Sequence, residues 1–267
     1  MNYINAIIFG IVQGVTEFLP VSSSGHLVIL HKYISLPIGN ELIFDVALHL
    51  STILAVILFF RKDVAKLFVS WIRSLAGKHD EYSKLAWLII LGTIPAGLAG
   101  YMFDDLIEQE FRSVVIVAAM LVLVGLFFIY VEKIAKKSKE LNNLGLKDAL
   151  IIGFAQAGAL IPGTSRSGIT VLAGLWLGFK RHEALRFSFL LSIPVILGAF
   201  ATKIPQVIAV NLSEVNISLL SLAFASSFIS AILAIKYFLQ FARKHSLNVF
   251  AYYRFILAIL VLALYFA

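Results

Sequence analysis

The sequence predicts an all-α polytopic membrane protein that forms a single integral membrane domain over residues 1–267. Of the 267 residues, 60% are apolar and only 14% are charged, and the mean hydropathy is +0.94. A soluble domain of this length could not bury so much apolar surface. The chain lacks the period-two alternation that is typical of a membrane β-barrel. Six long apolar segments, each near the ~20 residues that a bilayer requires, complete the argument.

The predicted transmembrane helices are separated by segments whose charges differ in sign. The six segments are 41–60, 85–103, 112–131, 185–203, 217–240 and 249–267. Between the first two, residues 61–84 carry six Lys or Arg, and their apolar side chains share one helical face, which predicts a helix on the membrane surface. The net charge of +7 is explained by basic loops held on the cytoplasmic side, so nucleic acid is not an expected partner.

Loop charges also predict the orientation. The basic segments 61–84, 132–147 and 241–248 are assigned to the cytoplasm, and the acidic segment 104–111 is assigned to the outside. Both termini are then outside. We expect a multi-pass protein of the bacterial plasma (inner) membrane. The chain has no cysteine, which excludes disulfides and thiol chemistry.

Residues 148–179 do not fit a simple crossing. Basic residues flank them on both sides, so the chain must enter and leave the membrane on the same face. Their apolar runs, 149–161 and 169–179, are each too short to span and are separated by PGTSRSG, residues 162–168. The pattern predicts a re-entrant helical hairpin with this motif at its tip.

A second copy of this pattern lies near the N-terminus. GIVQGVTEFLPVSSSG (10–25) aligns with GFAQAGALIPGTSRSG (153–168) at an offset of 143 residues, which pairs Gly10 with Gly153, Gln13 with Gln156, Ser22 with Ser165, Ser24 with Ser167 and Gly25 with Gly168. We interpret this as a diverged repeat, although a short match between apolar sequences also arises by chance.

The repeat predicts an inverted topology. Half 1 covers residues 1–131, a cytoplasmic linker covers 132–147, and half 2 covers 148–267. Each half is a re-entrant hairpin followed by three transmembrane helices. Because three is odd, the second half enters the membrane with the opposite orientation, and the two hairpin tips converge near the middle.

The second tip has the composition of an anion site. A charge at membrane depth costs several kcal/mol unless it is compensated, so Arg166 needs a partner. Arginine binds phosphate or carboxylate through parallel hydrogen bonds. Gly163 allows close approach of the backbone, Ser165 and Ser167 add hydroxyls, and the following helix directs its free N–H groups to the same place. The alternative is that Arg166 only pairs with Glu17 to hold the two hairpins together.

The first tip supplies different groups. Gln13 and Glu17 are four residues apart and share one helix face. Ser22 and Ser23 precede His26, and a hydroxyl near an imidazole is a candidate nucleophile–base pair. Taken alone, serines before a helix are more often N-caps, and a single histidine is more often structural.

Four further polar residues have supporting roles in this prediction. Asp45 and His49 share a face of the 41–60 helix, where they could brace the site or hold a cation. Thr170 follows Arg166 by one turn and could contact the same anion, and Gln156 is the repeat partner of Gln13.

QGVTEFLPVSSSGH (13–26) and PGTSRSGIT (162–170) together resemble the motifs of the bacterial undecaprenyl-diphosphate phosphatases, the UppP/BacA family. The family's first motif is Glu or Gln, three residues, then Glu, and it matches Gln13 and Glu17. The run Ser-Ser-x-Gly-His matches residues 22–26. The second motif, P-G-x-S-R-S-x-x-T, matches residues 162–170. Gln13 stands where some members of the family have Glu.

The resemblance implies the activity. It implies hydrolysis of undecaprenyl diphosphate to undecaprenyl phosphate and inorganic phosphate, in the lipid-carrier cycle of peptidoglycan synthesis, and a role in bacitracin resistance. It also implies a site on the outer-leaflet (periplasmic) side and a divalent cation, Mg²⁺ or alternatively Ca²⁺, for which Glu17 is the candidate ligand. A homodimer is a possible assembly.

Combined with the residues, the resemblance assigns roles. The candidate catalytic residues are Ser23, His26, Glu17 and Arg166. The candidate diphosphate-binding residues are Arg166, Ser165, Ser167, Gly163, Thr170 and Ser22, with Gln13, Gln156 and Asp45 in support. Either Ser23 or His26 is the nucleophile. The alternative function is a polyprenyl-phosphate flippase or another anion transporter, which would also need Arg166 but would not require the Ser23, His26 and Glu17 set.

Overall fold

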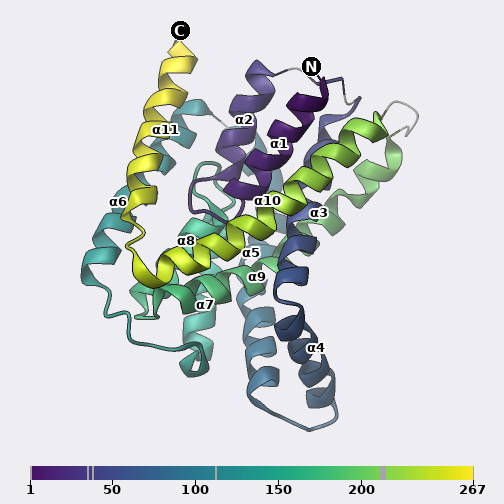
Figure 1. Cartoon of the computed structure of the whole chain (residues 1–267). Helices are drawn as coiled ribbons and strands as arrows, with labels where there is room; N and C mark the ends of the chain where they lie inside the picture. The colour runs from purple at the N-terminus through teal and green to yellow at the C-terminus, as the bar shows by residue number, and fades with distance from the viewer. Residues whose placement is uncertain (1, 35, 38, 112, 211–214, 267) are drawn as a thin grey trace.

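The computed structural model describes residues 2–34, 36–37, 39–111, 113–210 and 215–266. In this part of the chain, six helices are long and apolar enough to cross a membrane (Figure 1). They are α3 (Glu41–Phe59), α5 (Glu81–Glu110), α6 (Val114–Ile134), α9 (Arg181–Ala209), α10 (Ile217–Lys244) and α11 (Asn248–Phe266). All six predicted transmembrane segments are confirmed, and the chain is an all-α, multi-pass membrane protein.

Each half begins with a pair of shorter helices. The first pair is α1 (Asn2–Thr16) and α2 (Ser23–Tyr33), and the second is α7 (Leu146–Gly158) and α8 (Arg166–Trp176). The motif PGTSRSG lies at the turn between α7 and α8, as expected for a hairpin tip. Entry of the two pairs from opposite membrane faces stays a prediction.

The two short pairs cross equivalent helices at equivalent glycines. Helix α1 packs against α10 of the other half, and α7 packs against α5 of the other half. A Cβ atom on Gly10 would lie 2.3 Å from the carbonyl oxygen of Ala223, and one on Gly153 would lie 2.4 Å from that of Gly92. Small residues of this kind allow membrane helices to approach closely. Gly10 and Gly153 are related by the offset of 143 residues, and the repeat itself stays a prediction.

The basic segments gather at one end of the molecule. Arg181, at the start of α9, donates to both carboxylate oxygens of Glu132 at the end of α6, at 2.8 and 2.6 Å. Glu132 also accepts from the backbone N–H of Leu247, between α10 and α11, at 3.0 Å. Helix α1 begins and α11 ends at the opposite end (Figure 1). This arrangement agrees with the loop assignments made from charge. We refer below to the end of the molecule that contains Arg181, Glu132 and Leu247 as the basic end.

The segment expected to link the halves is an ordered part of this end. Residues 135–140 are largely extended, with a bridge between Lys139 and Phe179, and a short 3₁₀ turn, η1 (Leu141–Asn143), precedes α7. The Lys139 ammonium lies 2.6 Å from the Asp148 carboxylate. The linker is therefore fixed against the second half.

Two expectations about segments between the transmembrane helices need correction. Residues 104–110 do not form an acidic loop, because helix α5 continues through them to Glu110. The amphipathic segment forms helix α4 (Arg61–Leu75), which packs along the start of α5, with the Trp71 and Trp87 rings 6.2 Å apart. Figure 1 shows α4 and the start of α5 projecting together beyond the other helices. Helix α4 is thus half of a helical pair rather than a separate surface helix.

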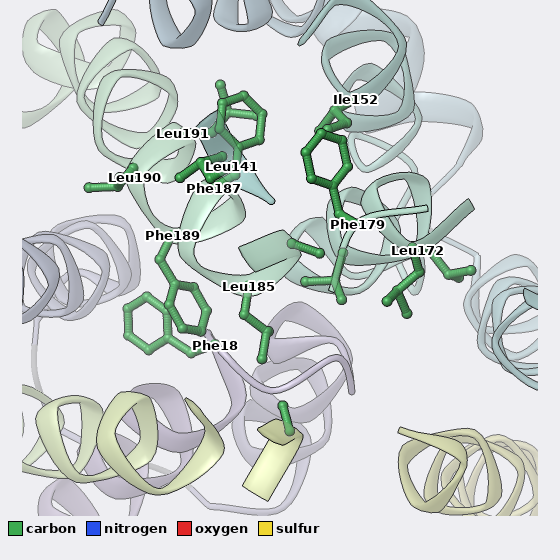
Figure 2. Close-up of a cluster of buried hydrophobic side chains, with 14 of the residues drawn as sticks. Phe18, Leu141, Ile152, Leu172, Phe179, Leu185, Phe187, Phe189, Leu190 and Leu191 are labelled. Carbon is green, nitrogen blue, oxygen red and sulfur yellow. The ribbon is translucent and has the colours of Figure 1, made fainter. Parts of the chain in front are cut away.

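Aromatic packing fixes the first hairpin tip against the second half. Phe18, in the turn after α1, lies edge-on to Phe189 of α9, with ring centroids 5.4 Å apart, and Figure 2 shows the two rings in the buried cluster. Phe60 packs on the same Phe189 ring at 6.3 Å. Such aromatic pairs contribute about 0.5–1.5 kcal/mol each beyond their buried area. The packing holds Glu17, the neighbour of Phe18, in place.

Candidate active site

The two hairpin tips have the same unusual backbone. Ser22 and Ser165 have φ angles of 71° and 72°, in the left-handed region that non-glycine residues avoid. Each is the N-cap of the helix that follows, and its hydroxyl accepts from the backbone N–H of Gly25 at 3.4 Å or Gly168 at 3.2 Å. Strain of this kind costs on the order of 1–3 kcal/mol per residue and clusters at functional sites. The shared turn gives the first residue of the following helix the same position relative to the N-cap in both tips.

Those two first residues meet on one carboxylate. Ser23 begins α2, and its hydroxyl donates to Oε2 of Glu17 at 2.9 Å. Arg166 begins α8, and one guanidinium nitrogen donates to Oε1 of Glu17 at 2.8 Å. The Ser167 hydroxyl also donates to the Leu19 carbonyl oxygen at 3.1 Å. The predicted convergence of the two tips is therefore confirmed.

Glu17 is the centre of this cluster. It is only 7% exposed, and the Gln13 amide donates to its Oε2 at 3.0 Å. The Nδ1 atom of His49 lies 3.4 Å from the same oxygen and 3.1 Å from the Gln13 amide nitrogen. A buried carboxylate needs such partners to stay ionised. His49, which the sequence suggested as a brace, therefore contacts the central carboxylate directly.

The cluster retains unused capacity for an anion. The second terminal nitrogen of Arg166, Nη1, is buried and has no hydrogen-bond partner among the described residues. The N-termini of α2 and α8 also meet here, and each directs positive dipole charge and free backbone N–H groups at the site. Arg166 thus pairs with Glu17, as the alternative expectation had it, and half of its guanidinium fork remains available to a ligand.

His26 makes its hydrogen bonds outside the Glu17 cluster. Its Nδ1 lies 2.8 Å from the Ser22 carbonyl oxygen, and its Nε2 lies 2.6 Å from the Tyr253 hydroxyl. A carbonyl oxygen only accepts, so Nδ1 carries the hydrogen and Nε2 accepts from Tyr253 in the neutral ring. The two rings stack at 5.7 Å with an interplanar angle of 10°. The structure pairs the Ser23 hydroxyl with Glu17, and it pairs His26 with Tyr253.

Several residues assigned to diphosphate binding make structural contacts around the second tip, and their role in binding stays a prediction. The Thr170 hydroxyl bonds to the Ser188 hydroxyl at 2.6 Å, which joins α8 to α9. Gly163 has φ 91° and allows the turn to approach α6, since a Cβ atom there would lie 2.5 Å from the Val117 carbonyl oxygen. The hydroxyls of Ser165 and Ser167 lie 3.3 Å apart. These contacts shape the tip that presents Arg166.

The supporting residues lie at different distances from the centre. Asp45 accepts from His31 at 3.0 Å, one turn of α3 before His49. Gln156 is buried, and neither atom of its amide has a hydrogen-bond partner in the described part of the chain. The structure therefore brings Gln13 to Glu17 and leaves the amide of Gln156, its repeat partner, without a described hydrogen bond.

Arg254 was not identified from the sequence, yet it connects both tips. This residue of α11 is fully buried. Its guanidinium donates to five backbone carbonyl oxygens at 2.8–3.2 Å, namely those of Pro20, Met120, Leu121, Gly163 and Thr164. Pro20 precedes the first tip, and Gly163 and Thr164 precede the second. The available signal was an arginine inside a predicted transmembrane segment, which is rare unless it has a specific role.

The donor set limits how a divalent cation could be held. No group of three or more His, Cys, Asp or Glu side chains positioned for a metal occurs in the described ranges. Mg²⁺ is commonly bound by one or two protein oxygens together with substrate phosphates and water. The Glu17 carboxylate and the buried Gln13 Oε1, which has no partner within the residues described, fit that pattern.

Known proteins are similar to this chain along nearly its whole length. Residues 6–260 match the family model described as bacitracin resistance protein BacA. A protein of Rubrobacter xylanophilus named undecaprenyl-diphosphatase is 42% identical over 99% of this chain and 98% of its own length. This chain is also similar to proteins of the same name from two other bacteria. The protein of Saccharophagus degradans is 44% identical over 96% of each chain, and that of Alteromonas mediterranea is 42% identical over 100% of each chain. The chain belongs to the bacitracin resistance protein BacA family.

Proposed function

We propose that this protein is an undecaprenyl-diphosphatase, which hydrolyses undecaprenyl diphosphate to undecaprenyl phosphate and inorganic phosphate. The observation that carries the proposal is the meeting of Ser23 and Arg166 on the two oxygens of Glu17. A hydroxyl bonded to a carboxylate is a nucleophile beside a base. A guanidinium with a free nitrogen is a binding group for phosphate.

An apolar groove next to the site supports a prenyl substrate. It has a volume of about 660 Å³, and its lining combines Val15 and Leu19 of the first hairpin with Ile229, Leu233 and Phe238 of α10. Val15 and Leu19 lie two residues before and after Glu17, so the groove and the catalytic cluster share the first hairpin. A polyprenyl chain in this groove would leave its diphosphate at the hairpin tips.

In the first step, the Ser23 hydroxyl oxygen attacks the terminal phosphorus. A bond forms between Ser23 Oγ and phosphorus, and the bond to the bridging oxygen breaks, so undecaprenyl phosphate leaves. Glu17 takes the serine proton through the hydrogen bond that it already accepts. The charge on the transferred phosphoryl group is stabilised by Nη1 of Arg166 and by the backbone N–H groups at the starts of α2 and α8.

In the second step, a water oxygen forms a bond to phosphorus and the bond between phosphorus and Ser23 Oγ breaks. Glu17 returns its proton to Ser23 Oγ, and both protons of the water leave with the inorganic phosphate as dihydrogen phosphate. His26 holds the backbone of Ser22 through its Nδ1–H and so keeps the strained turn that presents Ser23. A bound Mg²⁺ or Ca²⁺ would supply charge neutralisation on the diphosphate oxygens, with Glu17 and Gln13 as its protein ligands. The pairing of Ser23 with Glu17 favours an enzyme over a carrier, because a carrier that only binds and releases its ligand does not require a hydroxyl hydrogen-bonded to a carboxylate.

The setting of this activity follows from the substrate. We infer that the protein acts in the bacterial plasma membrane with its site open toward the outer leaflet. There it recycles the lipid carrier of peptidoglycan synthesis. Loss of that activity would make cells more sensitive to bacitracin and would impair cell-wall formation and the maintenance of cell shape.

The test is phosphate release from undecaprenyl diphosphate by the purified protein in detergent, with and without Mg²⁺ or Ca²⁺. Wild type is compared with Glu17→Gln, which keeps the shape of the side chain but removes the base and the charge. We expect steady release by wild type and a loss of at least about 10³-fold in the variant.

Wild-type protein that is folded, binds the lipid and releases no phosphate would contradict the proposal. A lipid-flipping assay in vesicles, run beside the hydrolysis assay, separates this result from transport. Movement of undecaprenyl phosphate across the bilayer without hydrolysis would assign the protein to the carriers.

A further inference from the structure

A second polar cavity lies at the basic end of the molecule. It has a volume of about 700 Å³ and is formed where α3 meets α4, together with the first turn of α9 and the last turns of α10. Its lining includes five Lys or Arg side chains, namely Arg61, Lys62, Arg186, Lys236 and Arg243. The cavity shares no lining residue with the Glu17 cluster, and its chemistry is not used by the proposed hydrolysis.

Most of these cations have no acidic partner. The lining contains two carboxylates. Asp63 pairs with Arg186 at 2.9 Å, and Glu183 lies 3.3 Å from His182. The other four cations form no ion pair with any carboxylate in the described ranges. Lys236 lies over the Tyr237 ring at 5.7 Å, and Arg61 donates to the Leu58 carbonyl oxygen at 3.4 Å. The cavity thus has an excess of three positive charges when His182 is neutral.

Two helix N-termini lie at this cavity, beside the C-terminal ends of α3 and α10. Helices α4 and α9 both begin at the cavity, and neither N-cap residue, Phe60 or Lys180, makes a side-chain hydrogen bond to its helix. The first backbone N–H groups of each helix therefore lack the usual side-chain acceptor. An anion at this position would accept from those N–H groups and interact favourably with both dipoles.

A layer of aromatic rings separates this cavity from the catalytic cluster. Phe60, which lines the cavity, packs on Phe189, and Phe189 packs on Phe18 beside Glu17. Phe238 lies on the other side of Phe189 at 6.4 Å. A ligand in the cavity and a diphosphate at the hairpin tips would therefore occupy distinct sites.

We propose that this cavity binds a phosphate group at the basic end of the protein, separately from the catalytic site. Phosphate matches the guanidinium and ammonium groups and the exposed helix N-termini better than a carboxylate does, because it offers more acceptor oxygens and more charge. The phosphate belongs either to the headgroup of an anionic lipid in the adjacent leaflet or to free inorganic phosphate. Phe59 and Leu239 at the cavity wall would contact the first carbons of a lipid.

The test measures binding of two probes to the purified full chain in nanodiscs of zwitterionic phosphatidylcholine. One probe is dioctanoyl phosphatidic acid, and the other is inorganic phosphate, each at constant ionic strength. The cavity variant K236Q/R243Q is compared with the control variant K78Q/K84Q, which removes two exposed cations near the start of α5, outside the cavity. Phosphate release by each variant is measured in parallel and reports on folding of the catalytic site.

We expect K236Q/R243Q to bind about tenfold more weakly than wild type, because two charge-assisted contacts are lost, while K78Q/K84Q binds as wild type does. An effect with phosphatidic acid alone identifies a lipid headgroup as the ligand, and an effect with inorganic phosphate as well identifies the free ion. Equal binding by the two variants, with normal phosphate release by both, would overturn the proposal. That result would leave the proposed hydrolysis unaffected, since the assay of phosphate release tests it separately.

Discussion

The two hairpin tips share a backbone and differ in chemistry. Each has a strained serine N-cap, Ser22 or Ser165, which bonds to a glycine three residues on and lies within 3.3 Å of a second serine hydroxyl. The residues that follow the two N-caps occupy equivalent positions in the repeat. They are Ser23 in the first tip and Arg166 in the second.

This difference shows how a duplicated turn can become an active site. One copy supplies a small hydroxyl and the other supplies a large cation, and the common geometry delivers both to Glu17. Glu17 has no acidic counterpart, since Leu160 stands at the equivalent position in the second half. Both tips keep the strained turn because it presents a side chain to Glu17 in each of them, whether that side chain is the hydroxyl or the cation.

Removing the hydroxyl of the first tip should have the largest effect. Ser23→Ala deletes the proposed nucleophile and leaves the backbone of the tip intact, so we expect kcat to fall by at least about 10³-fold. The measurement is phosphate release under saturating lipid. Ser24→Ala is the matched control, because Ser24 is the neighbouring hydroxyl and its only described side-chain contact is with Ser22. Comparable losses in both variants would contradict the assignment of the nucleophile.

Changing the shape of the cation in the second tip should have the next largest effect. Arg166→Lys keeps the charge but loses the fork that bonds Glu17 with one nitrogen and leaves the other free. We expect kcat/KM to fall by about 10²-fold, since a single ammonium cannot serve both partners. Arg186→Lys, at an ion pair away from the tips, should change kcat/KM by less than about threefold. Full activity in Arg166→Lys would show that charge alone is sufficient.

Removing the connection between the tips should affect stability. Arg254→Met leaves buried carbonyl oxygens of both tips and of α6 without their donor, at about 1–3 kcal/mol for each group that finds no other partner. We expect the melting temperature in detergent to fall by on the order of 10 °C. Arg243→Met removes an exposed arginine and is the control. An unchanged melting temperature for Arg254→Met would mean that the bonds of Arg166 to Glu17 and of Ser167 to Leu19 hold the tips together without it.

Much of this arrangement could be predicted from the sequence, for physical reasons. Apolar length predicted the six transmembrane helices, and the offset of 143 residues predicted two tips that meet. Partner choice within the cluster could not be predicted, because whether Glu17 contacts Ser23 or His26 depends on the turn of the chain at Ser22. Arg254 and Tyr253 lie in the last helix, far from both motifs, and only the packing of α11 on α6 brings them to the site. The acidic segment 104–111 was predicted as a loop because charge was weighed above helix continuation.

The equivalent glycines should give similar, moderate effects. Gly10→Ala and Gly153→Ala each place a methyl group 2.3–2.4 Å from a backbone carbonyl oxygen of the other half. We expect each to lower the stability by about 1–3 kcal/mol, because the crossing helices must separate slightly. Unfolding in a denaturing detergent measures both changes. Gly97→Ala, where a Cβ would meet nothing within 4 Å, should be neutral. A large difference between the first two variants would show that the two crossings are not equivalent.

The smallest expected effect tests the role of His26. Tyr253→Phe removes one hydrogen bond to His26 Nε2 and keeps the stacked ring, so we expect kcat to fall by only about fivefold, near the net value of one such bond. If His26 were the nucleophile, the change would free its reactive nitrogen and raise the rate. Chemical stability of the trapped phosphoenzyme gives an independent answer, since phosphohistidine is labile to acid and phosphoserine is labile to alkali. An acid-labile intermediate, or a faster Tyr253→Phe variant, would transfer the nucleophile from Ser23 to His26. Either result would leave Ser23, at the position equivalent to Arg166, as a group that only orients Glu17.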